Sequence, residues 1–469
     1  MKPQITDDTR KVTKDSIFLQ TPQNLKFIEV LPKNVRIIER DMLGQYFNTK
    51  IKIIGITGTN GKTTTAAAIY SILLDMGYKV ALLGTRGMFM NDVQIKQKGL
   101  TTPSLLELYE DIDMAANAGC DFFVMEVSSH AIKQERIYGL EFFLKILTNI
   151  TSDHLDYHKT WEDYCQTKMQ FLKSGDCPKI INLDDKSGAT IRFYQNVFTY
   201  GVESKGHFFV NAYGLRDGIF AQVGLRMPNV DSTQQSYNNT IQECVLESHL
   251  FGLFNLYNIL AATLAIYIIT KKPLQTISAY VHNFGGVSGR MEIVSKNPLV
   301  IVDFAHTTDG MQQVFESFKT RNISVVFGAG GDRDKSKRQK MGECAALYAK
   351  KIYITNDNPR TEKPLNIARA IAKGVLNNSM NYKNVEENNE EFMENVAYNF
   401  QTKGSNGIMQ IVLDRLKAIE LALHELPQDW VLLVLGKGDE TTQIFKESEV
   451  HFSDKESIQA LLLNTKTLV

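Results

Sequence analysis

GITGTNGKTTTA, residues 55–66, is the stretch on which the interpretation of the whole chain depends. It is similar to a phosphate-binding loop, but the usual pattern has a glycine five positions before the glycine of the Gly-Lys pair. Ile56 stands at that position, and the glycines fall instead at Gly55, Gly58 and Gly61. The stretch is therefore either a nucleotide site with its own spacing or a glycine-rich turn without a ligand.

The residues on either side of this loop favour the nucleotide site. The apolar run IKIIGIT, residues 51–57, predicts a buried strand, and residues 63–78 have apolar side chains at helical spacing. Backbone N–H groups at the start of such a helix bind phosphate oxygens. Lys62 adds a positive charge, and Thr63 offers a hydroxyl to Mg²⁺. Strand, loop and helix in this order predict a phosphate site.

Strands and helices alternate along the rest of the chain, which predicts mostly parallel α/β sheets. Apolar runs predict strands at residues 17–21, 26–31, 79–85, 121–129, 298–304, 324–331, 351–357 and 430–438. Helices are predicted at 102–119 and 256–269, and a β-rich excursion is predicted between residues 205 and 250. The polar stretch NVEENNEE, residues 384–391, predicts a surface insertion.

The pattern predicts an α/β protein of three domains. Residues 1–46 form a short N-terminal α/β unit, and residues 47–286 form a central P-loop-type mononucleotide-binding domain that contains the β-rich excursion. Residues 287–469 form a C-terminal Rossmann-like domain. We expect GGVSGR, residues 285–290, to be the hinge about which the last domain closes.

Composition excludes several classes of protein. Lys+Arg and Asp+Glu both total 52, which argues against a nucleic-acid binder driven by net charge. The 5 cysteines are scattered and form no CxxC pair, so neither a disulfide framework nor a structural zinc site is expected. The polar N-terminus lacks an apolar signal core, and the most apolar helix, near Leu256–Thr270, is too short to span a bilayer. We expect a cytoplasmic monomer without a membrane span.

Several other residues each allow a functional and a structural interpretation. Glu126 ends a predicted strand, where a carboxylate can bind Mg²⁺ or simply be exposed. TNITSDHLDYH, residues 148–158, contains two histidines and two aspartates that could bind metal, although a single histidine is more often structural. Lys168 has the character of an exposed helix lysine, TTPS (101–104) that of a helix cap, and DNPR (357–360) that of a turn.

Taken together and in order, these motifs resemble those of a known family. TGTNGKTTT, MEVSSH, TNITSDHLDYH, YCQTK, LFGLFNLYN, GRMEIV, VDFAHT, FGAGGDRDKSKR, DNPRTEKP and LGKGDE occur between about Thr6 and Asp454. The set resembles the Mur ligases, and among them those that add the third residue of the peptide in peptidoglycan synthesis. This family uses GxxGxxGK[ST], the glycine spacing of this chain, so the resemblance implies that the loop binds ATP.

The resemblance implies an ATP-dependent amide ligase. A substrate carboxylate becomes an acyl phosphate, an amine attacks it, and the tetrahedral intermediate collapses to the amide, ADP and phosphate. Two Mg²⁺ ions and fixed cations would stabilise the anionic groups. The implied catalytic residues are Lys62, Glu126, His154 and Lys168. The implied metal ligands are Thr63, Glu126, His154 and Lys168, the last as N6-carboxylysine formed with CO₂. The implied ATP-binding residues are Gly58, Thr59, Asn60, Gly61, Lys62, Thr63, Thr64, Asn258, Arg290, Asp303 and His306.

The resemblance also implies the two small-molecule substrates. UDP-N-acetylmuramoyl-L-Ala-D-Glu would be bound by Thr9, Thr101, Thr102, Ser104, Ser128, Gln134 and Arg136. Thr9 stands where the family's uridine-binding stretch usually has serine, and the N-terminal domain is shorter than is common. The amino acid would be bound by Arg333, Asp357, Asn358, Pro359, Arg360, Gly436 and Glu440.

DNPR resembles the variant that takes meso-diaminopimelate. Arg360 can bind the second carboxylate of diaminopimelate through two parallel hydrogen bonds, and lysine would leave this arginine unpaired. Asp439 stands where the family often has histidine, which makes the surroundings of this pocket more acidic. The alternatives are a lysine-adding ligase, a ligase like folylpolyglutamate synthase, and, from another class, a switch or scaffold that binds ATP without ligase chemistry.

Overall fold

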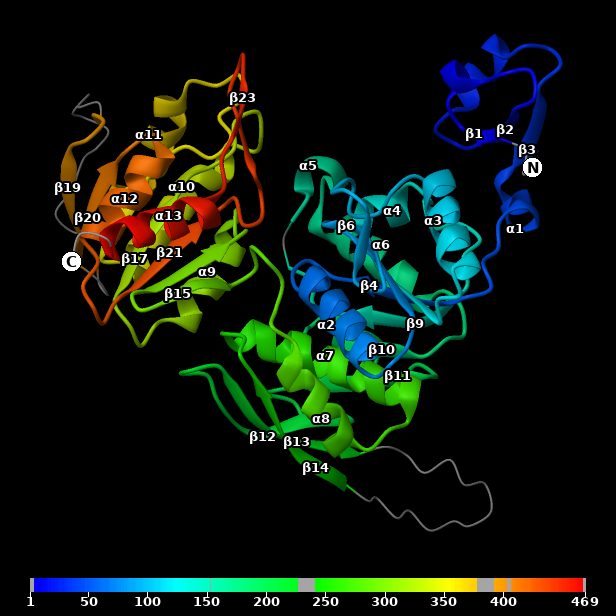
Figure 1. The fold of residues 1–469 in the computed structure, drawn as a ribbon, viewed down its shortest axis with the longest axis horizontal. Coiled ribbons are helices and arrows are strands. Elements are labelled where there is room, and N and C mark those ends of the chain that lie inside the picture. Colours follow the sequence, from blue (N-terminus) through cyan, green and yellow to red (C-terminus); the bar gives the residue numbers. More distant parts are fainter. Residues whose placement is uncertain (1–3, 152, 227–240, 378–391, 403–405, 467–469) are drawn as a thin grey trace. The chain divides into compact units, whose positions relative to one another are not determined.

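The computed structural model describes residues 4–151, 153–226, 241–377, 392–402 and 406–466 (Figure 1). By their internal contacts the residues divide into two compact units. Unit 1 comprises Met1–Gly214, Phe220–Ser248 and Asn255–Phe284, and unit 2 comprises Leu215–Ile219, His249–Phe254 and Gly285–Val469. The surface insertion predicted at residues 384–391 lies outside the described residues.

The core of unit 1 is one large sheet. Its strands are β4 (Lys52–Thr57), β5 (Val80–Gly84), β6 (Gly87–Met90), β7 (Val93–Lys96), β8 (Phe122–Glu126), β9 (Phe142–Leu147), β10 (Lys179–Asn182), β11 (Val197–Gly201), β12 (Phe208–Gly214), β13 (Ile219–Arg226) and β14 (Ile241–Ser248). Within the described part of the chain their order is β14-β13-β12-β11-β10-β9-β4-β8-β5-β6-β7. The strands from β5 to β12 through β4 pair in parallel, and β13 pairs antiparallel with β12. The predicted β-rich excursion is confirmed, as one end of this sheet.

Helices connect the strands and cover the sheet. They are α2 (Lys62–Asp75), α3 (Leu105–Asn117), α4 (Ser129–Lys133), α5 (Leu155–His158), α6 (Trp161–Lys173), the 3-10 helix η4 (Gly188–Ile191), α7 (Leu253–Thr270) and α8 (Leu274–Asn283). Because alternate residues of a strand face opposite sides, Phe123 and Met125 of β8 pack with Leu108 of α3 and Leu172 of α6 in one core cluster. α2 contacts β4, β5 and β8.

α7 is the most apolar helix. It has 18 residues, so it begins earlier than the sequence pattern indicates, and by length and composition alone it could cross a membrane. However, 67% of it is buried inside the protein, and Leu256, Ile259 and Ala262 are almost fully covered. A buried core helix passes the same test of length and composition, so α7 is explained as the central helix of unit 1.

The N-terminal residues form a small three-stranded parallel sheet. The elements are β1 (Ile5–Thr6), β2 (Ile17–Gln20), β3 (Arg36–Glu39), α1 (Leu43–Tyr46), and the 3-10 helices η1 (Thr9–Lys11), η2 (Leu25–Val30) and η3 (Arg40–Met42). The strand predicted at residues 26–31 is therefore wrong. Leu25, Phe27 and Val30 are exposed, so this run has no buried face, and Asn24 folds the chain by accepting from Thr21 N.

Unit 2 is a second α/β layer structure. Its strands are β15 (Glu292–Lys296), β16 (Leu299–Asp303), β17 (Ile323–Phe327), β18 (Lys351–Ile354), β19 (Ala397–Gln401), β20 (Asn406–Ile411), β21 (Val431–Leu435), β22 (Thr442–Ile444) and β23 (Glu449–His451). The main sheet has the order β15-β16-β21-β17-β18-β20-β19, parallel except at its two ends, and β22 pairs with β23. The four strands predicted in this region are confirmed as β16, β17, β18 and β21.

Both faces of this sheet are covered by helices. These are α9 (Thr308–Ser317), α10 (Ser336–Tyr348), α11 (Pro364–Asn377), α12 (Arg415–His424) and α13 (Asp454–Lys466). Ile301 and Leu433 pack in a cluster with residues of α9, α10 and α11, whereas Val300 and Leu432 pack with residues of α12 and α13. This alternation produces the predicted Rossmann-like arrangement.

Two glycines allow α10 and α11 to pack closely. A Cβ on Gly342 of α10 would lie 2.1 Å from the Ile371 carbonyl oxygen, and a Cβ on Gly374 of α11 would lie 1.9 Å from the Gln339 carbonyl oxygen. α10 follows the GGDRD stretch and α11 follows DNPR. The close packing of the two helices therefore fixes the separation of two loops that carry predicted site residues.

We expect Gly374→Ala to destabilise the protein by about 1–3 kcal/mol, because the added methyl group meets backbone that cannot move aside without separating the helices. Thermal unfolding followed by circular dichroism would measure this. Gly44→Ala is the matched control, since a Cβ at Gly44 has no heavy atom within 4 Å. An unchanged midpoint for Gly374→Ala would contradict the close packing.

Candidate active site

The glycine loop has the geometry of an anion-binding turn. It connects β4 to α2, and Gly61 caps α2 with a left-handed backbone, at a φ of 84°. A Cβ at Gly61 would lie 2.2 Å from Oδ1 of Asn258, and one at Gly58 would lie 1.9 Å from Oγ1 of Thr148. Both positions thus require glycine, and the backbone N–H groups at the start of α2 can point at a phosphate.

Lys62 folds back over this loop. Its Nζ donates to the carbonyl oxygens of Gly58 and Thr59, at 2.9 Å each. Thr148 Oγ1 and Asn149 Nδ2 both donate to the Asn60 carbonyl oxygen. The loop is therefore held from one side by its own lysine and from the other by the residues that follow β9.

Thr63 and Glu126 lie together at the carboxyl edge of the sheet. Thr63 Oγ1 donates to Oε2 of Glu126 at 3.0 Å, and the backbone N–H of Thr85 donates to Oε1 at 2.9 Å. Glu126 is only 2% exposed. The structural alternative, an exposed glutamate at a strand end, is therefore wrong. A hydroxyl and a carboxylate side by side are oxygen ligands of the kind that Mg²⁺ prefers.

Lys168 is buried, not exposed. Only 1% of its surface is accessible, and its Nζ donates to the Gly58 carbonyl oxygen at 2.9 Å. Burial lowers the pKa of Lys168 well below its ordinary value, and the nearby charge of Lys62 lowers this pKa further, while Asp153 opposes the shift. The amine is thereby shifted toward its neutral, nucleophilic form.

A group of aromatic rings connects Lys168 to the histidines. Lys168 Nζ lies 4.7 Å from the centre of the Tyr164 ring, and Tyr164 OH is 2.9 Å from Thr59 Oγ1. The ring of His154 lies 6.3 Å from that of Tyr164 and 4.9 Å from that of His130, between centroids. Within the described residues, however, no three His, Cys, Asp or Glu side chains are grouped so as to hold a metal ion.

Four of the residues predicted to bind the muramyl substrate, Thr102, Ser128, Gln134 and Arg136, form one connected network beside Glu126. Thr102 Oγ1 donates to the Glu126 carbonyl oxygen and accepts from Ser128 N. Arg136 donates to the Thr102 carbonyl oxygen at 2.7 Å and to Oε1 of Gln134 at 2.6 Å. Thr101 Oγ1 is 3.2 Å from Thr85 Oγ1.

Two residues predicted to bind the muramyl substrate, Ser104 and Ser128, are also helix caps. For Ser104 this is the structural alternative expected for the TTPS stretch. Ser104 Oγ accepts from Glu107 N at the start of α3, and Ser128 Oγ accepts from Ala131 N at the start of α4. Thr9 begins the 3-10 helix η1, which lies between strands β1 and β2 of the N-terminal sheet.

Asn258, a residue of α7, places its side chain beside the start of α2. It is 3% exposed, donates to Oδ1 of Asn255 at 3.0 Å and accepts from Thr65 Oγ1 at 3.4 Å. This position beside Gly61 connects α7 to the loop, and the predicted contact with adenine stays a prediction.

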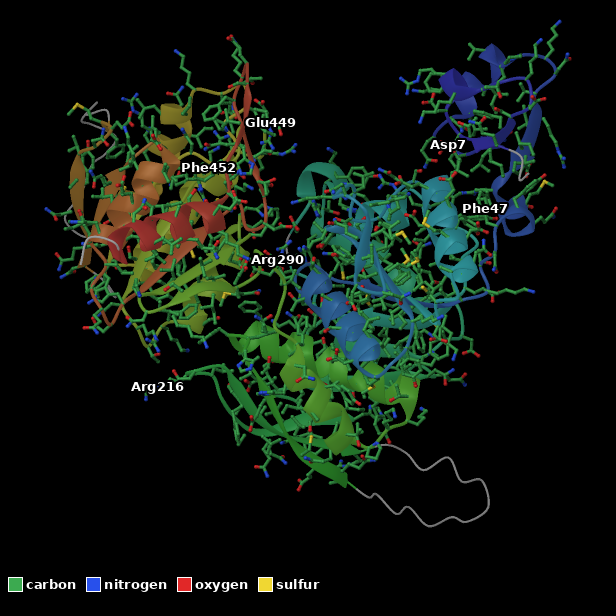
Figure 2. All side chains as sticks on the ribbon, in the orientation of Figure 1. Asp7, Phe47, Arg216, Arg290, Glu449 and Phe452 are labelled. Carbon is green, nitrogen blue, oxygen red and sulfur yellow. The ribbon has the colours of Figure 1, made fainter. Side chains whose placement is uncertain are left out.

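The other predicted nucleotide residues belong to unit 2, where they lie near one another. Arg290, labelled in Figure 2, stacks over the ring of Phe304 at 4.5 Å. The carboxylate of Asp303 accepts from the N–H groups of Met291 and Ala305, and burial raises its pKa although Arg290 opposes the shift. His306 Nδ1 lies 2.9 Å from the Phe304 carbonyl oxygen. Asp303 therefore holds the backbone directly after Arg290 and directly before His306.

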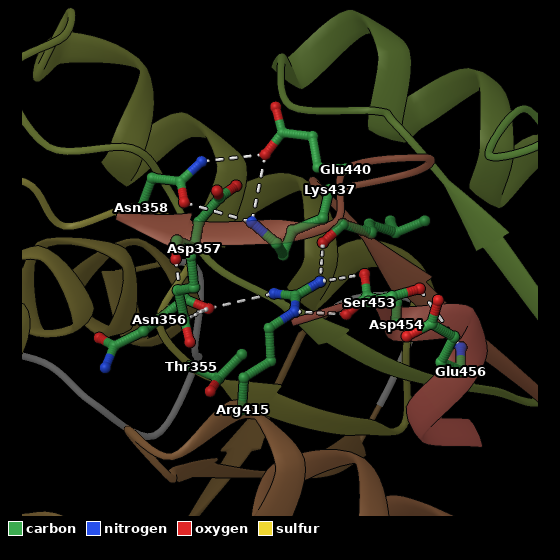
Figure 3. Close-up of polar contacts among 12 residues, drawn as sticks. Thr355, Asn356, Asp357, Asn358, Arg415, Lys437, Glu440, Ser453, Asp454 and Glu456 are labelled. Carbon is green, nitrogen blue, oxygen red and sulfur yellow. Dashed lines mark hydrogen bonds and ion pairs between the residues drawn. The ribbon is translucent and has the colours of Figure 1, made fainter. Parts of the chain in front are cut away.

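The predicted amino-acid residues surround a buried cluster at the ends of β18 and β21 (Figure 3). Asn358 Nδ2 donates to Oε2 of Glu440 at 2.9 Å, and Lys437 Nζ donates to Oδ1 of Asn358 and Oε2 of Glu440. Gly436 has a φ of 113°, a conformation that favours glycine, and a Cβ there would also lie 2.8 Å from the Asp357 carboxylate. Lys437 has no exposed surface.

A buried ion pair joins the two loops beneath this cluster. Arg415 donates to both carboxylate oxygens of Asp454 at 2.7 Å, to the Leu435 carbonyl oxygen at 2.9 Å and to the Asn356 carbonyl oxygen at 3.2 Å. Both side chains of the pair are fully buried. Arg415 thus ties the loop after β18 to the loop after β21.

Arg360 is held by the GGDRD stretch. Its Nη1 donates to the Gly331 carbonyl oxygen at 2.8 Å, and Gly331 allows Pro359 to approach, since a Cβ there would lie 1.9 Å from the Pro359 carbonyl oxygen. Arg333, from the same stretch, is exposed. The two loops are joined by Glu362, which accepts two bonds from Arg338, at 3.0 and 2.8 Å, and one from Asp332 N.

Several residues of this site were not predicted from the sequence. Tyr164, Thr85 and Lys437 contact the predicted residues Thr59, Glu126 and Glu440. Arg415, Asp454, Arg338 and Glu362 instead join the loops that carry predicted residues. For two of these residues the sequence contains a signal that indicates their place in the site. Tyr164 precedes Lys168 by four residues and so shares its helix face, and Lys437 lies inside the GKGDE motif. The remaining contacts join residues that are far apart in the sequence.

Comparison with known proteins identifies the family. The model of the Mur ligase middle domain matches residues 56–266, and that of the Mur ligase glutamate ligase domain matches residues 289–438. The UDP-N-acetylmuramoyl-L-alanyl-D-glutamate–2,6-diaminopimelate ligase of Helicobacter pylori is 48% identical, covering 98% of this chain and 96% of that protein. This chain belongs to the Mur ligase family.

Two further comparisons agree with this assignment. The protein of the same name from Wolinella succinogenes is 50% identical to this Mur ligase over 461 residues, covering 98% of this chain and 96% of the relative. A solved structure, also of a UDP-N-acetylmuramoyl-L-alanyl-D-glutamate–2,6-diaminopimelate ligase, has a TM-score of 0.65 at 25% identity and covers 99% of this chain and 95% of its own. The three-domain Mur ligase fold is therefore confirmed.

We expect Glu362→Gln to lower the thermal midpoint of this Mur ligase most at neutral pH. Hydrogen bonds from Arg338 hold the pKa of Glu362 at about 2. A carboxylate with a lowered native pKa stabilises the fold fully above its unfolded pKa, about 4.3, and this stabilisation is lost as the pH falls through the native value. The wild-type and variant midpoints should thus converge between about pH 5 and pH 2.

Differential scanning fluorimetry from pH 7 to pH 3 would measure this convergence. Glu420→Gln, at an exposed position of α12, is the control and should shift neither the midpoint nor its pH dependence. A gap between wild type and Glu362→Gln that stays constant over this range would contradict the ion-pair account.

Proposed function

We propose that this Mur ligase adds meso-diaminopimelate to UDP-N-acetylmuramoyl-L-alanyl-D-glutamate in the bacterial cytoplasm, with ATP converted to ADP and phosphate. The observation that carries the proposal is the near-full-length identity of about half the residues to two ligases of that name. The reaction would supply a peptidoglycan precursor. The D-glutamate carboxylate would be phosphorylated, and the amine of diaminopimelate would attack the acyl phosphate.

The nucleotide would bind at the glycine loop of unit 1. Mur ligases are ATP-dependent enzymes, and the glycine turn at Gly58 and Gly61 followed by Lys62 combines a helix start with a positive charge, as a phosphate site requires. The network of Thr102, Arg136 and Gln134, which contacts the main chain of Glu126, is our proposed site for the muramyl peptide. We further propose that the domain boundaries fall after residues 46 and 286, which gives domains of residues 1–46, 47–286 and 287–469.

The residues beside the loop fit a magnesium ion. Thr63 Oγ1 and Glu126 Oε2 are hard oxygen donors 3.0 Å apart, and nucleotide oxygens would complete the shell. Bound magnesium would neutralise charge on the phosphates during transfer. Glu126 is held by Thr85 so that its Oε2 faces Thr63. A second ion would use His154.

Lys168 fits modification by CO₂. A carbamate forms from a neutral amine, and burial already shifts Lys168 toward that form. The modification would replace a buried cation next to Lys62 by an anion, which removes a like-charge repulsion and adds oxygen ligands. We therefore assign Lys168 to the metal site in its carbamylated form, because the ammonium group of an unmodified lysine donates hydrogen bonds and does not bind a cation.

The choice of amino acid tests the proposed function. Phosphate release with ATP and UDP-N-acetylmuramoyl-L-Ala-D-Glu should require meso-diaminopimelate, and L-lysine should support it poorly, because only diaminopimelate has a second carboxylate for Arg360. Arg360→Lys should raise KM for diaminopimelate at least about tenfold, through loss of a bidentate bond worth about 1.5–3 kcal/mol. Release with lysine would keep the ligase and reject the role of Arg360; equal release without any amino acid would favour an ATP-driven switch.

The modification of Lys168 is tested by removing its side chain. Lys168→Ala should lose at least about 10²-fold in kcat, since the anionic group near the transferred phosphate is missing. Added bicarbonate should not restore activity, whereas a small carboxylic acid such as acetate should restore part of it by occupying the cavity. Lys173→Ala, at an exposed position at the end of the same helix, is the control. Full activity of Lys168→Ala would reject the modification.

A further inference from the structure

Lys437 is an unusual residue, a lysine with no exposed surface inside the amino-acid cluster of unit 2. The residues on both sides, Gly436 and Gly438, have left-handed backbones, with φ of 113° and 56°. The two glycines turn the chain so that the side chain of Lys437 points inward (Figure 3). A buried charge of this kind costs free energy unless it is paired and hydrogen-bonded.

Both partners of Lys437 are residues that the family resemblance assigns to the amino acid. Its Nζ lies 3.2 Å from Oδ1 of Asn358 and 3.1 Å from Oε2 of Glu440. Oδ1 of Asn358 also accepts from the N–H of Ile444 at 3.0 Å. A reversed amide would place its NH₂ against two donors, so Lys437 and Ile444 together fix the amide of Asn358 in one orientation.

This orientation determines what Glu440 can offer. Oε2 of Glu440 accepts from both Lys437 Nζ and Asn358 Nδ2, the latter at 2.9 Å. The side chain is 26% exposed, so the carboxylate reaches the surface of the cluster. With Oε2 used by two donors, Oε1 is the oxygen that remains for a ligand.

Formal charges indicate which ligand this oxygen would accept. Arg415 and Asp454 neutralise each other as a bidentate pair. Lys437 pairs with Glu440, and Asp357 is a further buried carboxylate, so these five side chains together carry one negative charge. Such a cluster attracts a cation, and an amino acid presents an ammonium group.

We propose that Lys437 is a positioning residue for the amino-acid substrate. It holds the Asn358 amide and one oxygen of Glu440 in place, so that the other oxygen of Glu440 meets the ammonium group of the incoming amino acid. The proposal rests on the proposed function, because it takes an amino acid as the ligand of this cluster. Lys437 itself contacts no substrate.

The test is the steady-state kinetics of Lys437→Met with each substrate varied in turn. We expect KM for meso-diaminopimelate to rise about 10- to 100-fold, the effect of losing a charge-assisted hydrogen bond, with KM for ATP and for the muramyl substrate unchanged. Lys417→Met, at an exposed position of α12, is the matched control. A rise of all three KM values together with a lower thermal midpoint would show a merely structural role and overturn the proposal.

A double-mutant cycle with Glu440→Gln decides whether Lys437 acts through Glu440. If it does, Lys437→Met/Glu440→Gln should have the KM of Glu440→Gln alone, whereas additive effects would overturn the proposal. If Lys437→Met does not fold, Lys437→Gln, which keeps one donor, replaces it in the same cycle. If the wild-type enzyme adds no amino acid, the proposed function is rejected. If the wild-type enzyme adds diaminopimelate and Lys437→Met has the same KM for it, only the role of Lys437 is rejected.

Discussion

The register of parallel strands is the constraint on which both candidate sites depend. In unit 1, Ile56 of β4 pairs with Glu126 of β8 and with Ile146 of β9, so three strands end at the same level. The glycine loop, Glu126 and Thr148 are thereby brought to one edge. Parallel strands must each be followed by a crossover, and the residues at the start of each crossover meet there.

The same constraint operates in unit 2 with different chemistry. Asp303 of β16 pairs with Leu435 of β21, and Phe327 of β17 with Ile354 of β18. The loops after these four strands carry His306, GGDRD, DNPR and GKGDE. Here the loops are joined by buried charges: Arg415 connects two of them through carbonyl oxygens, and Arg338 connects two through Glu362. A buried ion pair is weak evidence for stability, but it defines one arrangement of the loops it joins.

The fold was largely predictable because hydrophobic runs report burial directly. The strands 298–304, 324–331 and 430–438 were found because each is apolar on both faces, as in a sheet covered by helices on both sides. The strand predicted for KFIEVL, residues 26–31, is wrong because an apolar run forms a strand only if another element covers it. Phe27 and Val30 are exposed. Glu126 is indicated by its place at the end of a predicted strand, whereas Lys168 is indicated only by the family resemblance, because its residue type and helix position alone favour exposure; the site roles of both stay predictions. Arg415 and Asp454 were missed because 39 residues separate them and neither lies in a recognisable motif.

The backbone at Arg360 connects the fold to the substrate choice that we propose. Arg360 has a φ of 52°, which costs a residue other than glycine about 1–3 kcal/mol. The surrounding contacts offset this strain, since Arg360 N donates to the Ile444 carbonyl oxygen and Nη1 donates to that of Gly331. An arginine fixed in this way loses little side-chain entropy when it binds a carboxylate. A bidentate grip uses two N–H groups of one guanidinium edge, so the bond to Gly331 orients the remaining groups. In the proposed role of Arg360, this strain is the cost of preorganising a carboxylate site, and the bonds to Ile444 and to Gly331, 29 residues away, hold the conformation.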